Sequence, residues 1–180
     1  MATVTPWEKG NIFGPKTAMA PKGEVVGRLM KAAKRPLIVV GAKILEEEVD
    51  GKSLLSYVVE LSKCGGIPVV ATAHTPKPLF ESGLQSAASM GMVEITDRLR
   101  DRNWSLDGKG PHDLAIFVGI TYQLQSQMLS TLKHFATHLK TVSLDRYYHP
   151  NADFSFPNLD EKTWIQNLDM VVGTLKSKSQ

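Results

Sequence analysis

A run of four aliphatic residues, 37–40, constrains the fold of this 180-residue chain more than any other feature. Pro36 precedes the run and Gly41 ends it. A continuous apolar run this short is typical of a strand buried on both faces, as in a parallel sheet. Apolar positions recur at helical spacing on either side of it, which indicates a helix–strand–helix unit. Ligands of such sheets bind beyond the carboxyl ends of the strands, so Gly41 and Ala42 mark a candidate site.

The same patterns predict the other elements. Helices are expected over 24–34, 53–63 and 124–135, with a last helix that Asn158 would cap and that would run to about residue 175. Further strands are expected over 67–71, 114–119 and 139–144. Strands that alternate with helices predict a three-layer α/β fold, a Rossmann-like parallel sheet between helices.

Two segments are less regular. In 72–92, Pro76 and Pro78 are expected to exclude a helix at the start, whereas 82–90 is expected to form a short helix. Residues 93–113 are interpreted as a charged excursion from the domain, with a solvated face. A loop is expected around Pro150 and Pro157.

The domain organisation predicted is an extended N-terminal arm, residues 1–23, followed by a single domain, residues 24–180. Proline and glycine recur throughout the arm, which gives it no core of its own. The arm nonetheless carries apolar side chains: Trp7, Ile12, Phe13 and Met19. We favour the interpretation that they hold the arm against its own domain; the alternative is that they dock a partner subunit.

Composition excludes several classes. A net charge of +3 is too small to indicate nucleic-acid or membrane-surface binding, and no apolar run spans a bilayer. No signal peptide is expected, so a reducing cytoplasm is the default location. Cys64 is the only cysteine, which excludes an intrachain disulfide and makes a cysteine-held zinc or iron–sulfur site unexpected. An iron–sulfur cluster relevant to this chain would belong to a partner.

The predicted strands all end in residues able to contact a cofactor, and parallel strands end at the same edge of a sheet. The candidate cofactor-binding residues are Gly41, Ala42, Lys43, Thr72, Ala73, His74, Gly119, Ile120, Asp145 and Arg146. The dinucleotide fingerprint is nevertheless absent, because Lys43 and Glu46 stand where its second and third glycines belong. Glutamates at 46–48 would also repel a phosphate, and no phosphate-binding P-loop motif occurs.

Catalytic candidates are few. His134 and His138 have the spacing of two metal ligands on a helix, but we interpret them as surface residues near its C-terminus, and no metal site is expected. His74 is the best candidate for a general base, although no nucleophile is paired with it. Cys64 is interpreted as a buried small residue. Asp145 and Arg146 could contact a ligand or form a local ion pair.

A resemblance to a known family rests on several segments together. They are 32–41, 67–72, 104–110 with Asp113 and Leu114, 139–146, and 151–159. With these segments in their order and spacing, the sequence resembles the ε subunit of the archaeal acetyl-CoA decarbonylase/synthase complex, the carbon monoxide dehydrogenase assembly of methanogens and their relatives.

This resemblance implies a DHS-like NAD/FAD-binding domain. It also implies tight association with the large α subunit, which holds the nickel–iron–sulfur cluster and oxidises CO. The small subunit would be accessory and non-catalytic, and could aid electron transfer. The alternative is a flavin- or nucleotide-binding redox module in its own right, with FAD as the candidate cofactor. A hydrolase on the same fold lacks a polar catalytic pair. A homo-oligomer with two-fold symmetry is compatible with the sequence.

Overall fold

The computed structural model describes residues 17–46, 48–49 and 51–177. Its centre is a six-stranded sheet in which every neighbouring pair is parallel, in the order β5-β4-β1-β6-β7-β8. The strands are β1 (Pro36–Val40), β4 (Val69–Ala71), β5 (Ala88–Ser89), β6 (Leu114–Val118), β7 (Lys140–Ser143) and β8 (Phe154–Ser155). Counted along the chain this is 3-2-1-4-5-6, the order of doubly wound dinucleotide-binding folds.

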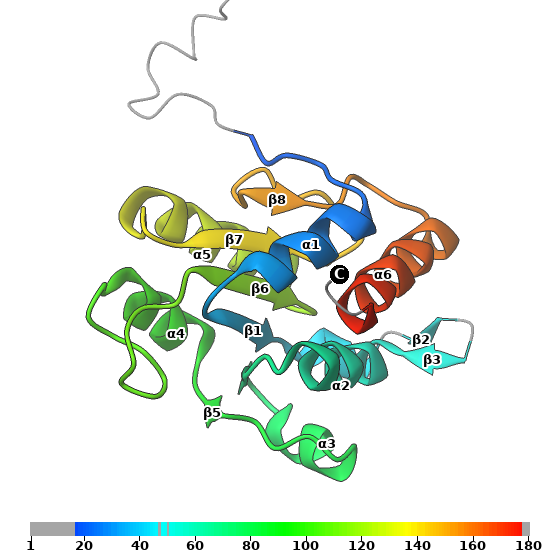
Figure 1. Ribbon diagram of the computed structural model, residues 1–180, viewed down its shortest axis with the longest axis horizontal. Helices are drawn as coiled ribbons and strands as arrows, with labels where there is room; N and C mark the ends of the chain where they lie inside the picture. Colours follow the sequence, from blue (N-terminus) through cyan, green and yellow to red (C-terminus); the bar gives the residue numbers. More distant parts are fainter. Residues whose placement is uncertain (1–16, 47, 50, 178–180) are drawn as a thin grey trace, which may run out of the picture.

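Helices alternate with these strands along the chain and pack around the sheet (Figure 1). They are α1 (Gly23–Ala32), η1 (Ala42–Leu45, a 3₁₀ turn), α2 (Leu54–Gly65), α3 (Pro76–Glu81), α4 (Met92–Arg100), α5 (Tyr122–Phe135) and α6 (Glu161–Lys176). A two-stranded antiparallel ribbon, β2 (Glu48–Val49) and β3 (Lys52–Ser53), precedes α2. None of the described helices is long and apolar enough to cross a membrane.

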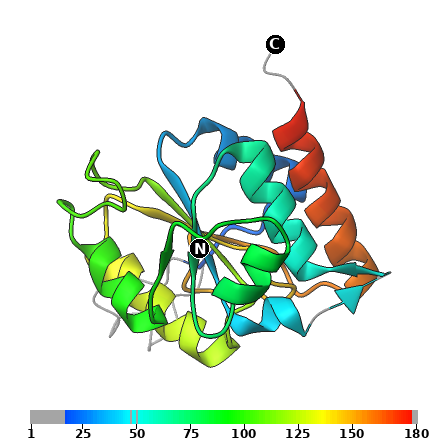
Figure 2. The same ribbon diagram turned by 90° about the horizontal axis from the view of Figure 1, so that it is seen from below.

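The sheet is covered on both faces (Figure 2). Alternate residues of a strand point to opposite faces. Ile38 and Val40 accordingly belong to the core shared with α1, α2 and α6. Leu37 and Val39 belong to the core shared with α4 and α5. The three-layer α/β prediction is therefore confirmed, and β1 is buried on both faces as its continuous apolar run predicts.

Helix α3 contradicts the prediction that Pro76 and Pro78 exclude a helix. Pro76 is the first helical residue, where the missing N–H would have had no partner within the helix. The short helix predicted over 82–90 is also wrong. Gly83 follows with a positive φ of 76°, and Ala88 then pairs with Val70 of β4 as a short edge strand.

The charged excursion predicted over 93–113 is in part a helix, α4. Its buried residues include Ile95 and Leu99, which pack into the core beside α5. The charges lie on the opposite side of the helix and pair along it, Arg98 with Glu94 and Arg100 with Asp97. The prediction of a solvated face is confirmed. The helix has its sequence signal in apolar residues four positions apart, such as Ile95 and Leu99.

The end of the predicted arm joins the sheet. Residues 1–16, with Trp7, Ile12 and Phe13, lie outside the described residues. The N–H of Met19 donates to the carbonyl of Asp153 (2.9 Å), and its carbonyl accepts from the N–H of Ser155 (3.0 Å). Ala18 is buried, whereas the side chain of Met19 is exposed.

Helix α6 starts later than predicted. Asp160, rather than Asn158, is its N-cap, and its carboxylate accepts the N–H of Thr163 at 2.9 Å. The segment predicted as a loop contains strand β8. Only two residues of β8 pair with β7, so the strand is too short to leave a clear pattern in the sequence.

Candidate functional site

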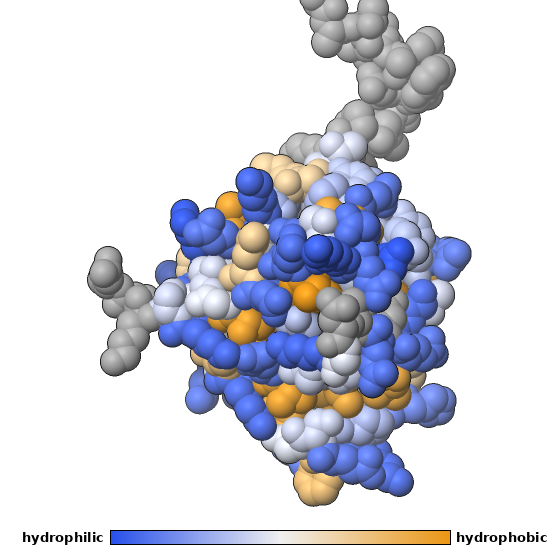
Figure 3. All heavy atoms as spheres, turned by 90° about the vertical axis from the view of Figure 1, so that its right-hand side faces the viewer, coloured by the Kyte–Doolittle hydropathy of each residue, from blue (hydrophilic) through white to orange (hydrophobic). Residues whose placement is uncertain are grey.

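The carboxyl ends of the strands gather at one edge of the sheet, as predicted. The arrows of β1, β6 and β7 point to the right in Figure 1, and Figure 3 looks onto that edge, where hydrophilic side chains predominate. The N–H of Thr72 donates to the carbonyl of Val40 (3.1 Å), and that of Gly41 donates to the carbonyl of Val118 (3.0 Å). The carboxylate of Asp145 accepts the N–H of Gly119 at 2.8 Å.

The sheet order places its topological switch point between β1 and β6, where Gly41 and Gly119 lie. In dinucleotide-binding proteins this crevice holds the pyrophosphate. Here it is closed by the chain itself. A Cβ on Gly41 would lie 2.3 Å from the carbonyl oxygen of Gly119, and a Cβ on Gly119 would lie 2.4 Å from the side chain of Ile44.

Two backbone N–H groups at this point, those of Lys43 and Gly119, are already used within the chain. The N–H of Lys43 donates to the carbonyl of Gly119 at 2.9 Å, and the N–H of Gly119 donates to Asp145. The cavity that remains has a volume of about 20 Å³, enough for about one water molecule. Of the predicted residues, it is lined by Lys43, Ile120, Asp145 and Arg146. These residues do not fit a pyrophosphate at the switch point.

The other predicted residues do not line this cavity. Thr72 uses its hydroxyl to donate to the carbonyl of Val40 (2.8 Å), a structural role next to Gly41. Ala73 adopts a positive φ of 53°, and His74 lies exposed in the same turn. Ala42 lies within η1. Whether any of these residues contacts a cofactor stays a prediction.

Sequence reasoning missed a buried polar network at the same edge. Gln125 donates to the hydroxyl of Ser143 (2.8 Å), which lies 3.3 Å from the carboxylate of Asp145. His149 is buried and stacks on Tyr122, with ring centroids 4.3 Å apart. The only available sequence signal was the histidine four residues after Asp145, in a segment interpreted as a loop.

His149 is neutral at pH 7. Burial lowers the pKa of its imidazole to about 4. Its Nε2 lies 3.7 Å from the carboxylate of Asp145, which is too long for a hydrogen bond. Its Nδ1 is buried without a hydrogen-bond partner among the described residues. The neutral imidazole of His149 therefore serves as a packing group beneath the ring of Tyr122.

The remaining candidates have structural surroundings. His134 lies on α5 and its ring contacts the carbonyl of Ser130, whereas His138 lies beyond the end of that helix, so the two rings do not share a helical face. Burial lowers the pKa of His138. Cys64 is half-buried and packs against the core under α2. No group of three metal-ligating side chains occurs within the described part of the chain.

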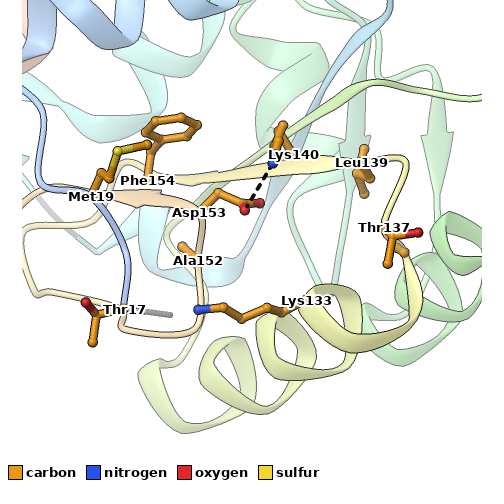
Figure 4. A pocket seen from close by; sticks show the side chains of 10 residues that line it. Thr17, Met19, Lys133, Thr137, Leu139, Lys140, Ala152, Asp153 and Phe154 are labelled. Carbon is orange, nitrogen blue, oxygen red and sulfur yellow. Dashed lines mark ion pairs between the residues drawn. The ribbon is translucent and has the colours of Figure 1, made fainter. Parts of the chain in front are cut away.

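A second hollow, of about 540 Å³, lies away from the strand ends, beside the start of β7 (Figure 4). Lys140 reaches across toward Asp153, with 3.7 Å between the charged atoms. Asp153 also accepts from the N–H of Thr141 (2.9 Å), and Lys133 donates to the carbonyl of Pro150 (3.0 Å). The polar groups of this hollow thus hold β7, α5 and the loop before β8 together.

Fold and site together define a class: a Rossmann-like parallel α/β domain whose own chain fills the switch point. Comparison with known proteins identifies one family within this class. A family model described as "CO dehydrogenase beta subunit/acetyl-CoA synthase epsilon subunit" matches residues 1–172. The chain belongs to this family.

Individual relatives agree. The chain is 43% identical to the acetyl-CoA decarbonylase/synthase complex subunit epsilon of Methanothermobacter thermautotrophicus, over 92% of this chain and 93% of the relative. It is 42% identical to that of Methanothrix soehngenii, over 95% and 91%. It is 37% identical to subunit epsilon 1 of Archaeoglobus fulgidus, over 89% and 86%. The resemblance inferred from the sequence is confirmed.

Proposed function

We propose that this chain is an accessory, non-catalytic subunit of an acetyl-CoA decarbonylase/synthase complex, and that it binds the large nickel–iron–sulfur subunit that oxidises CO. The observation that carries the proposal is the match to epsilon subunits over nine-tenths of the chain. The strand-end geometry supports it, because the N–H of Lys43 is bonded to Gly119 and the carboxylate of Asp145 to the N–H of Gly119, so these groups serve to hold the strand ends together.

Co-expression with the large subunit tests this proposal. We expect the two chains to co-purify in a fixed ratio when only the small chain carries an affinity tag. We expect CO-dependent reduction of a viologen dye by the complex and none by the small chain alone. CO oxidation by the isolated small chain would contradict a non-catalytic role, and a failure to co-purify would contradict the association.

The second candidate function is a flavin- or nucleotide-binding redox module on a DHS-like domain. The observation that favours it is an open hollow of about 560 Å³ next to the closed switch point, a volume typical of ligand sites. In this proposal FAD would lie over Lys43 and the neighbouring tyrosines, outside the crevice between Gly41 and Gly119. Melting curves with and without FAD test it, because FAD at 100 times its Kd would add roughly 2.7 kcal/mol of stability. An unchanged melting temperature at saturating FAD would rule out a site in the isolated chain.

A further inference from the structure

An open hollow lies at the carboxyl edge of the sheet, next to the closed switch point, and several of its lining residues are tyrosines. It is lined by Lys43, Tyr122, Gln123, Tyr147, Tyr148, Pro150 and Asn158, and we call it the tyrosine hollow. It shares Lys43, Tyr122 and Tyr147 with the small cavity beneath it, where Arg146 and His149 also lie. Tyrosine and arginine are among the residue types that most often dominate binding energy at protein interfaces.

Two of the tyrosines in the walls of the hollow, Tyr122 and Tyr148, are held in place by the chain itself. The hydroxyl of Tyr122 donates to the carbonyl of Tyr148 (3.0 Å), and its ring rests on buried His149. The N–H of Tyr148 donates to the side chain of Asn158 (3.0 Å), and its hydroxyl donates to the carbonyl of Ala18 (2.6 Å). A surface whose side chains are already ordered loses little conformational entropy on binding.

Positive charge lies in the tyrosine hollow and beside it: Lys43 lines the hollow, and Arg146 lines the small cavity beneath it. Among the described residues, no carboxylate forms an ion pair with Lys43 or Arg146, whereas Arg28, Arg35, Arg98 and Arg100 each have one. The Arg146 guanidinium lies over the Tyr147 ring at 5.0 Å, and its buried Nε has no acceptor within the part of the chain that the structure describes. The carboxylate of Asp145 is bonded to Gly119 and Ser143.

We propose that the tyrosine hollow is the surface through which this chain docks its large partner, and that an acidic segment of the partner inserts between Lys43 and Arg146. This inference rests on the proposed function. A carboxylate there would form ion pairs with the ammonium group of Lys43 and the guanidinium group of Arg146, and the three tyrosine rings would exclude water around the pair.

The test measures the Kd between the full-length chain and the large subunit. Lys43→Gln and Arg146→Gln are each expected to weaken binding about tenfold or more, and Tyr147→Ala by a similar factor. The wild-type Kd is expected to rise with salt, and the double variant K43Q/R146Q is expected to lose most of that dependence. Lys43 and Tyr147 donate no side-chain hydrogen bond among the described residues, so both variants should fold.

Matched controls lie elsewhere on the chain. Lys109→Gln removes an exposed lysine from a distant loop, and Phe135→Ala removes an exposed aromatic ring from the far end of α5. Both are expected to bind within about twofold of wild type. Wild-type affinity in every hollow variant would overturn the docking surface and leave the proposed function standing. No binding by wild type would overturn both. A change in self-association by ultracentrifugation, with partner affinity intact, would instead assign the hollow to a second copy of this chain.

Discussion

The position of Gly119 has two structural requirements that only glycine, among the amino acids, meets. Its φ of 69° lies in the left-handed region, which side chains with a Cβ avoid, and its α-carbon faces Ile44 so closely that a Cβ would overlap it. The carbonyl of Gly119 receives the N–H of Lys43, so the same residue holds η1 against β6. The glycine that ends the third long strand thus closes the switch point.

Replacing Gly119 tests this role. Gly119→Ala is expected to lower the free energy of unfolding by about 2–4 kcal/mol, because strain at positive φ adds to a clash with the Ile44 backbone. Gly173→Ala is the matched control: apart from its chain neighbours and the backbone of its own helix, no atom lies within 4 Å of the added Cβ, and the position is exposed inside α6. It is expected to raise stability by about 0.5–1 kcal/mol. Urea titrations of both variants measure the difference, and equal effects would contradict the closed switch point.

At the scale of the elements, two residues near the start of α6, Asp160 and Asn158, are of types that commonly cap helices, but only Asp160 caps this one. Asp160 accepts the N–H of Thr163 and caps the helix, whereas Asn158 accepts the N–H of Tyr148 and fixes the wall of the tyrosine hollow. Both residue types are common N-caps, and the sequence pattern favoured Asn158 because Glu161 follows three residues later. The backbone path after β8 decided between them.

Amide exchange distinguishes the two roles. Asp160→Ala is expected to cost about 1 kcal/mol and to speed hydrogen exchange at the N–H of Thr163, which loses its acceptor. Asn158→Ala is expected to leave exchange at Thr163 unchanged and to speed it at Tyr148. Faster exchange at Thr163 in Asn158→Ala would show that Asn158 is the cap after all.

At the scale of the whole molecule, buried histidine couples the stability of the fold to pH. Burial lowers the pKa of His149 to about 4, whereas the unfolded chain has a histidine pKa near 6.5. The unfolded state therefore binds a proton first as pH falls. The stability that His149 contributes is present above pH 6.5 and is lost between pH 6.5 and pH 4. Burial also lowers the pKa of His112 and His138, so they act in the same direction.

From these pKa values, the His149 contribution to the free energy of unfolding should fall by about 2 kcal/mol between pH 7 and pH 5. Urea unfolding of wild type and His149→Gln at both values measures it. The variant is expected to start less stable at pH 7 and to lose about 2 kcal/mol less than wild type on acidification. An equal loss in the two proteins would assign the pH dependence to other groups.

The sequence itself determined the α/β class, the four longer strands and the family. Leu37 to Val40 could only be buried on both faces, since a continuous apolar run has no side to offer to water, and the glycine at the end of such a strand marked the correct edge of the sheet. The strands and the fold class depend on local chemistry, which a single chain segment carries, whereas the family resemblance rests on several segments in their order and spacing.

Only the tertiary structure decided what lies at that edge. Strands of two residues such as β8 exist because a neighbouring strand pairs with them, so their own composition carries little signal. Likewise Gly41 and Gly119 are 78 positions apart, and either alone is compatible with an open cofactor crevice. Their mutual packing removes the space that a pyrophosphate would need. Lys43 then lies in the wall of a hollow lined by tyrosines, and Arg146 lies in the small cavity beneath it. Contacts between segments distant in sequence, rather than any motif, set the chemistry of this edge.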